Sequence, residues 1–220
     1  MLPDQGPQAR LAAKSMNKFG SARRPFLFII DFLMQEPVII PLDEINPERL
    51  LYYINGQTNI GNNTPAFNNN FRFEKRLPAF TRYKEAFEKV MEHLLYGNSF
   101  LLNLTLPTAL YCELSLKEIF YRSNAAYKLW YDDMFVVFSP ELFIKITSNR
   151  IESHPMKGTI DASVRNAEHK ILNDKKEIAE HNTIVDLIRN DLNRIVRNVR
   201  VEKFRFITPV HTHNKTLLQV

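Results

Sequence analysis

Two short blocks of the sequence carry residue types that could do chemistry. They are residues 155–159 (Pro-Met-Lys-Gly-Thr) and residues 180–191 (Glu-His-Asn-Thr-Ile-Val-Asp-Leu-Ile-Arg-Asn-Asp). Lys157 lies two residues after Pro155 and directly before Gly158, so its backbone approach is restrained on one side and open on the other. A lysine is a nucleophile only when neutral, a form that partial burial favours, and its flexible stem lets the amine reach a substrate ring. Lys157 is therefore a candidate nucleophile, the alternative being a surface lysine in a strand-to-loop turn.

Glu180 opens the second block and lies on one stripe of a predicted helix over residues 177–192. The other members of this stripe are Thr183, Ile184, Leu187 and Ile188. Because the stripe should face the core, a carboxylate on it is costly unless it is paired or binds a cation. Magnesium takes oxygen ligands from one or two carboxylates and fills its other positions with substrate and water. An ion pair with Lys176, or simple exposure at the helix edge, explains the same position equally well.

Together, in this order and at this separation, the two blocks resemble the chorismate-binding enzymes, which share one catalytic domain for opening several aromatic pathways. Two further segments resemble the same family, residues 139–143 (Ser-Pro-Glu-Leu-Phe) and residues 97–105 (Gly-Asn-Ser-Phe-Leu-Leu-Asn-Leu-Thr). In that family, alanine at the position of Lys157 goes with anthranilate synthase, and lysine goes with aminodeoxychorismate synthase component I. The resemblance covers residues 17–220. It implies an α+β fold, an antiparallel β-sandwich flanked by helices and incomplete at the C-terminus.

The resemblance also implies a reaction, the amination of chorismate at C4 to 4-amino-4-deoxychorismate in para-aminobenzoate and folate biosynthesis. Lys157 would attack the ring at C2, and Glu180 would help to hold a magnesium ion, the implied cofactor. Gly158 and Thr159 would offer backbone donors to a substrate carboxylate. The ammonia would come from a separate glutamine amidotransferase subunit.

Glu141 is a second candidate catalytic residue, 16 residues before Lys157. Residues 142–148 and 150–154 are predicted to form two strands that meet at a tight Ser148-Asn149 turn. Such a hairpin would bring Glu141 and Lys157 to the same end of a sheet, where the carboxylate could hold or relay the lysine's proton. The alternative makes Glu141 an ordinary charge at a strand end.

Two other functions stay open. An anthranilate or isochorismate synthase is one, although Lys157 disfavours it. The other is a non-catalytic fragment that only binds the amidotransferase subunit, which the end of the chain suggests, since residues 215–220 (Lys-Thr-Leu-Leu-Gln-Val) stop in mid-strand. We expect this strand to lack a partner, and its open edge to promote association. The resemblance implies that further site residues would follow in a longer chain: a second magnesium-binding glutamate, a histidine that acts as general acid, and an arginine that binds a substrate carboxylate. We therefore expect these 220 residues alone to be inactive.

Composition narrows the class of protein. Apolar residues make up 45% and charged residues 24% of the 220 positions, as in soluble globular proteins. The single cysteine, Cys112, excludes an internal disulfide and a cysteine-based zinc cluster, and it suits a reducing cytoplasm. The longest apolar candidate, residues 26–33, is interrupted by Asp31 and is far shorter than the roughly 18 residues of a membrane span. Of the net charge of +5, residues 1–30 carry +4, which leaves a nearly neutral body and argues against nucleic-acid or membrane binding.

The domain prediction has three parts: a disordered leader over residues 1–16, an N-terminal strand and helix region over 17–80, and the catalytic domain over 81–220. Elements outside the two blocks follow from local signals. Helices are predicted over residues 46–54 and 81–96 and after the capping box at Ser115. Strands are predicted over residues 26–33, 38–40, 135–138 and 199–206.

Overall fold

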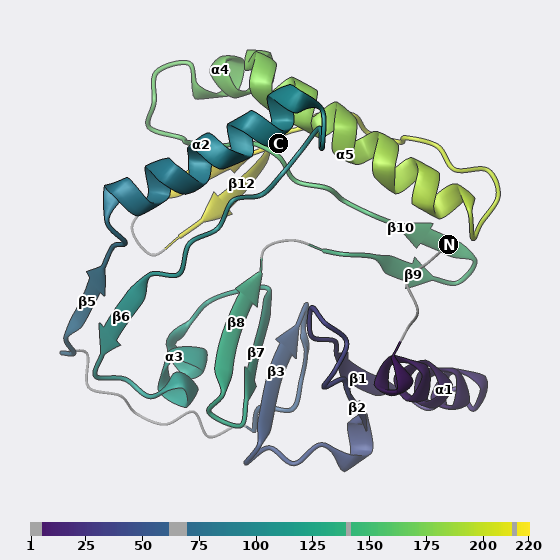
Figure 1. The fold of residues 1–220 in the computed structure, drawn as a ribbon. Helices are drawn as coiled ribbons and strands as arrows, with labels where there is room; N and C mark the ends of the chain where they lie inside the picture. Colours follow the sequence, from purple (N-terminus) through teal and green to yellow (C-terminus); the bar gives the residue numbers. More distant parts are fainter. Residues whose placement is uncertain (1–5, 62–69, 140–141, 213–214) are drawn as a thin grey trace. The chain divides into compact units, whose positions relative to one another are not determined.

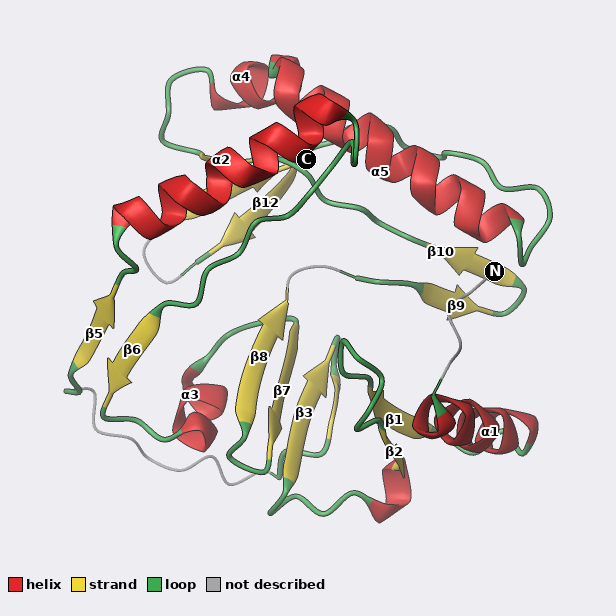
Figure 2. Ribbon diagram, viewed as in Figure 1, coloured by secondary structure: helices red, strands yellow, loops and turns green. Residues whose placement is uncertain are grey.

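The computed structural model describes residues 6–61, 70–139, 142–212 and 215–220 (Figures 1 and 2). The chain divides into two compact units, each made of two separate stretches. The first contains Met1–Phe71 and Glu113–Phe138, and the second contains Arg72–Cys112 and Ser139–Val220. This division differs from the predicted boundary between residues 80 and 81, because a strand from the second stretch of the first unit pairs with an N-terminal strand.

The first unit is built on a four-stranded sheet in the order β4-β3-β7-β8. Its central pair, β3 (Leu50–Ile54) and β7 (Tyr127–Tyr131), runs antiparallel with Tyr52 opposite Leu129 (Figure 1). A separate antiparallel pair, β1–β2, also belongs to this unit. The remaining elements are α1 (Pro7–Ser21), β1 (Phe26–Ile29), β2 (Val38–Pro41), the 3-10 turn η1 (Leu42–Glu44), β4 (Gln57–Thr58), α3 (Leu116–Arg122) and β8 (Phe135–Ser139).

Both faces of this sheet are covered. Leu50 and Leu51 are neighbours on β3, so their side chains point to opposite faces. Leu50 packs with Leu27 of β1, whereas Leu51 packs with Trp130 of β7 and Phe120 of α3. Both leucines are 1–2% exposed, and burying such a side chain stabilises the folded state by about 1.5–3 kcal/mol. The first unit therefore has a layered core with β1–β2 on one side and α3 on the other.

The predicted helix over residues 46–54 is wrong, because β3 occupies most of that range. Asn46 does form one turn, in which its backbone oxygen accepts hydrogen bonds from the N–H groups of Arg49 and Leu50 at 3.0 and 2.9 Å. After this turn the chain extends and pairs with β7. Pairing of an apolar and aromatic segment along a buried strand has overridden the local capping signal.

The predicted disordered leader is also wrong where the structure describes it, since residues 7–16 lie in α1. Pro7 stands in the first turn of the helix, a position where proline is well tolerated. Ala9 and Ala12, three residues apart on one face, are buried, and α1 contacts β2. The segment is rich in strong helix formers, namely Gln, Ala, Arg, Leu, Lys and Met, and packing of one face stabilises the helix.

The second unit contains three helices and three small antiparallel sheets among its described residues. The sheets are β5–β6, β9–β10 and the three-stranded β11-β13-β12. Its elements are β5 (Phe73–Arg76), α2 (Phe80–Tyr96), β6 (Ala109–Cys112), β9 (Lys145–Thr147), β10 (Arg150–Glu152), β11 (Thr159–Asp161), α4 (Ala167–Asn173), α5 (Lys175–Asn193), β12 (Thr208–His211) and β13 (Thr216–Gln219).

Several predicted elements are confirmed. Helix α2 matches the predicted helix over residues 81–96 and ends at Gly97, whose φ of +88° is the left-handed conformation that ends many helices. The capping box at Ser115 is present at the start of α3. Strands β9 and β10 form the predicted hairpin, with Ser148 in the turn at a φ of +54°. The apolar stripe of α2, however, is substantially exposed, as Phe87 and Leu95 show.

The end of the chain differs from the prediction. Strand β13 is the central strand of its sheet, with β11 on one side and β12 on the other, so the expected unpaired edge does not exist. The predicted strand over residues 199–206 is absent; that described segment is irregular, and Arg205 within it has a φ of +50°. One partner of β13, β12, directly precedes it in the sequence, whereas the other, β11, is distant.

The predicted α+β class with antiparallel sheets and helices is confirmed. Among the described residues, no helix combines the length and the apolar character that a membrane span requires.

Candidate active site

Lys157 and Gly158 together face one residue, Val220, at the end of the β11–β13 pair. The Lys157 N–H donates to the Val220 oxygen at 2.8 Å, and the Val220 N–H donates to the Gly158 oxygen at 3.2 Å. Two residues opposite one is the pattern of a β-bulge, which bends a strand and changes the direction of a side chain. The backbone of Lys157, which is half-buried, is therefore held by the sheet at a point where the chain departs from regular pleating.

Gly158 also brings this strand against α5. Its φ is +85°, a conformation that suits glycine and strains other residues. A Cβ atom placed on Gly158 would lie 3.2 Å from Glu177 Oε2 and 3.3 Å from Glu177 Cγ. The first turn of α5 thus lies in close contact with the Lys157–Gly158 segment, and the missing side chain of Gly158 is what permits the approach.

Helix α5 begins at Lys175, two residues before the predicted start at 177, and a carboxylate caps it. The Asp174 Oδ1 atom accepts hydrogen bonds from the N–H groups of Lys176 and Glu177 at 2.9 and 3.1 Å. These are two of the donors that a helix start leaves unpaired. The cap fixes the first turn, on which Glu177 and Glu180 stand three residues apart and therefore on the same side of the helix.

Glu180 is 25% exposed. The stripe predicted to face the core does so only in part, because Ile184 and Ile188 are half-buried whereas Thr183 and Leu187 are exposed. Lys176 Nζ lies 3.4 Å from its Oε1 atom, so the ion pair that was the alternative explanation for Glu180 is present. The same ammonium lies 3.9 Å from Glu177 Oε1, and Glu177 is 24% exposed. Lys176 therefore pairs with both carboxylates. Its pKa is raised, and the largest cause is the negative charge of Glu180.

The structure describes one of the two remaining candidate residues, Thr159, but not the other, Glu141. Thr159 is the first residue of β11 and is exposed. Glu141 lies outside the described residues, so its place relative to Lys157 stays a prediction. Sequence reasoning missed Glu177 as a site residue, although its spacing of three from Glu180 was the available signal. The pairing of Lys157 and Gly158 with Val220 had no signal in the sequence.

Among its described residues, the second unit has few buried side chains. Its buried side chains among the described residues are Ala167, Ile171, His181 and Val220. His181 follows Glu180 directly and meets the edge of Phe204 with ring centroids 5.4 Å apart. Burial, and secondarily the charge of Arg205, lower the pKa of His181. Two of these buried residues thus belong to the site region, because Val220 pairs with the Lys157–Gly158 segment and His181 lies in α5.

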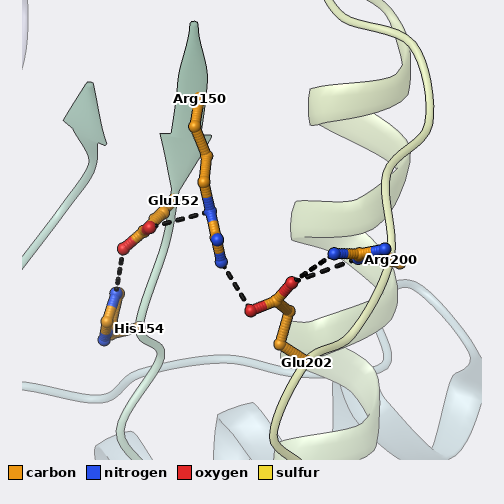
Figure 3. Close-up of polar contacts among 5 residues, drawn as sticks. All are labelled: Arg150, Glu152, His154, Arg200 and Glu202. Carbon is orange, nitrogen blue, oxygen red and sulfur yellow. Dashed lines mark hydrogen bonds and ion pairs between the residues drawn. The ribbon is translucent and has the colours of Figure 1, made fainter. Parts of the chain in front are cut away.

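A charged network holds the strand that leads into residues 155–159. Figure 3 shows it running from His154 through Glu152, Arg150 and Glu202 to Arg200. Arg150 donates to Glu202 at 2.6 Å, which ties β10 to the irregular segment that was predicted as a strand. Hydrogen bonds from Arg150 and then Arg200 lower the pKa of Glu202.

This network makes a pH-dependent contribution to stability. We expect Glu202→Gln to lower the urea midpoint of unfolding slightly at pH 7, because exposed ion pairs contribute little. The folded-state pKa of Glu202 is depressed below 4.5, so its stabilisation is present above that pH and is lost as the pH falls through the lowered folded-state pKa. The difference in midpoint between wild type and Glu202→Gln should thus shrink below pH 4.5. Glu92→Gln, an exposed glutamate on α2, is the control; an equal pH-dependent difference there would contradict the assignment.

The side chains of Glu177 and Glu180 could supply some, but not all, of the ligands of a hard divalent cation. Glu177 and Glu180 supply carboxylate oxygens, the ligands such cations prefer, and both are mostly shielded from solvent. Within the described ranges, no group of three or more His, Cys, Asp or Glu side chains is placed to hold a metal ion. Two carboxylates are nevertheless sufficient for magnesium, which keeps several waters and often takes further oxygens from a substrate.

Comparison with known proteins gives a consistent result. A family model described as chorismate binding enzyme matches residues 43–213. An uncharacterized PabA-like protein of Haemophilus influenzae is 43% identical over 203 residues, which are 92% of this chain and 61% of that protein. Aminodeoxychorismate synthase component 1 of Bacillus subtilis is 30% identical over 141 residues, 57% of this chain and 30% of that protein. Anthranilate synthase component 1 of Aquifex aeolicus is 38% identical over 86 residues, 36% and 17% of the two chains. No solved structure matches.

Proposed function

The chain belongs to the chorismate-binding enzyme family, and we propose that its protein aminates chorismate at C4 to give 4-amino-4-deoxychorismate. The similar proteins carry two different reaction names, aminodeoxychorismate synthase and anthranilate synthase, so similarity alone leaves the choice open. The chain spans about three fifths of the length of the Haemophilus influenzae relative, and the activity is proposed for the whole protein. The observation that favours amination at C4 is Lys157, a lysine held at a bulge against Val220.

In the proposed reaction Lys157 acts as a nucleophile. Its neutral Nζ forms a bond to ring carbon C2 while the C4–O bond breaks, and the hydroxyl leaves as water after taking up a proton. Ammonia then bonds to C4 as the C2–N bond breaks, which returns the free lysine. Forming and breaking a covalent link divides one difficult substitution into two easier steps. Glu141 is proposed to hold or relay the lysine's proton.

The neighbouring residues would bind and orient the substrate. Gly158 and Thr159 are proposed to offer backbone N–H groups to one carboxylate of chorismate. Glu180, with Glu177 beside it, is proposed to hold a magnesium ion, which when bound supplies positive charge for a substrate carboxylate. A separate glutamine amidotransferase subunit is the proposed source of ammonia, and the PabA-like name of the Haemophilus influenzae relative is compatible with that partnership.

The identity of the product tests the proposal. Protein expressed from its complete reading frame would be incubated with chorismate, ammonium and magnesium, and the products separated by liquid chromatography with mass detection. We expect 4-amino-4-deoxychorismate. Anthranilate or isochorismate as the main product would overturn the proposal in favour of another reaction of the same family. Binding of an amidotransferase subunit without any turnover would favour a non-catalytic role.

A further inference from the structure

The ion pairs of Lys176 suggest a second role for the first turn of α5. Lys176 Nζ lies 3.4 Å from Glu180 Oε1 and 3.9 Å from Glu177 Oε1, so one ammonium serves both carboxylates. The Lys176 side chain is 77% exposed, whereas the two glutamates are 24% and 25% exposed. The ammonium is thus well solvated, whereas the two carboxylates are largely shielded from solvent.

The charges in this arrangement do not balance. Two carboxylates carry two negative charges, and one ammonium neutralises only one of them. Partly buried like charges on one side of a helix repel each other unless a cation compensates them. A divalent cation would neutralise both, which the lysine cannot do. Lys176 can swing into solvent at little cost, because an exposed ion pair of this spacing is weak.

The close approach of Gly158 places this charge cluster beside the candidate nucleophile. Glu177 Oε2 would lie 3.2 Å from a Cβ on Gly158, the residue after Lys157. A cation between Glu177 and Glu180 would therefore lie next to the segment that carries Lys157. That position is compatible with a cation that binds substrate in the same site.

We propose that Lys176 is an internal competitor of the divalent cation, occupying the carboxylates of Glu177 and Glu180 until magnesium displaces it. The inference rests on the proposed magnesium role of Glu180. Lys176 would make the free protein less anionic at this site and would lower its apparent affinity for magnesium. Removing its charge should consequently tighten magnesium binding without adding any ligand.

Isothermal titration calorimetry tests this directly. Magnesium chloride is titrated into the protein expressed from its complete reading frame, and the Kd is measured. We expect Lys176→Gln to lower the Kd for magnesium by about twofold to fivefold, the range set by weak exposed ion pairs. Lys176→Arg keeps the charge and should behave as wild type. Lys175→Gln removes the same charge one residue earlier, on an exposed position, and should have the smaller effect.

Two further variants separate this inference from the proposed function. Glu180→Gln and Glu177→Gln should both weaken magnesium binding while the urea midpoint shows that the protein still folds. If Glu180→Gln weakens binding but Lys176→Gln leaves the Kd unchanged, or changes it no more than Lys175→Gln does, competition by Lys176 is overturned and the metal role of Glu180 stands. If Glu180→Gln has no effect, or wild type shows no saturable binding, both ideas fail.

Discussion

Replacing Lys157 with alanine is expected to abolish covalent capture of the chorismate ring. Without ammonia the first proposed step should stop at the adduct, in which Nζ is bonded to C2 and one water has been lost. Intact-mass spectrometry of wild-type protein incubated with chorismate and magnesium should therefore show the mass of chorismate less one water. Lys157→Ala has no amine to form this bond, so the added mass should disappear.

The control for this experiment is Lys170→Ala, an exposed lysine on α4 in the same unit. It should form the adduct as wild type does, which shows that loss of any lysine is not the cause. The same adduct on Lys157→Ala would contradict the assignment. Turnover is the weaker measurement, because direct attack by ammonia on bound chorismate can leave residual product without a lysine.

Elements whose signals are local in the sequence could be predicted. Helix α5 has its capping carboxylate at Asp174 next to its first residue, and α3 has a complete capping box at Ser115. The β9–β10 hairpin needs only a tight turn at Ser148 between two short strands. In each case the residues that determine the conformation lie inside or next to the element.

The failures have a common physical cause. The segment at β3 carries a helix cap at Asn46, yet it becomes a strand because β7, far away in the chain, pairs with it. Strand β13 lies at the centre of its sheet because β11, far earlier in the chain, pairs with it on the side opposite the neighbouring strand β12. Pairing between distant segments depends on the whole fold, and local propensity is only a weak guide to it.

The same distinction applies to the candidate site. Residue types at Lys157 and Glu180 could be singled out from short blocks of sequence. The contact of Gly158 with Glu177 could not, because it requires both a positive φ and the packing of a helix against a distant strand. That contact links the segment that carries Lys157 to the helix that carries Glu180, the two residues to which the proposed function assigns roles.

Gly158→Ala is accordingly expected to destabilise the protein more than the same change at another left-handed glycine. Gly97 is the matched control, because its φ is +88° against +85° for Gly158, and a Cβ there would meet nothing within 4 Å. Both alanines carry the cost of a left-handed backbone, about 1–2 kcal/mol. At Gly158 the new methyl group must also displace Glu177 and would lie 3.4 Å from Ile171 Cγ1. Gly158→Ala should therefore lower the free energy of unfolding more than Gly97→Ala does. Urea unfolding of the two variants measures this difference.

A double-mutant cycle with Glu177→Ala then identifies the contact that causes the excess. Shortening Glu177 removes the Oε2 and Cγ atoms that the new methyl group would meet, so Gly158→Ala should cost less in the Glu177→Ala background than in wild type. The contact with Ile171 stays, and part of the excess should remain. Equal costs in both backgrounds, or equal losses at Gly97 and Gly158, would show that the approach of α5 to the Lys157–Gly158 segment is not an energetic constraint. If the constraint is real, Gly158→Ala should also slow adduct formation at Lys157, because the backbone that positions this lysine must shift to admit the methyl group.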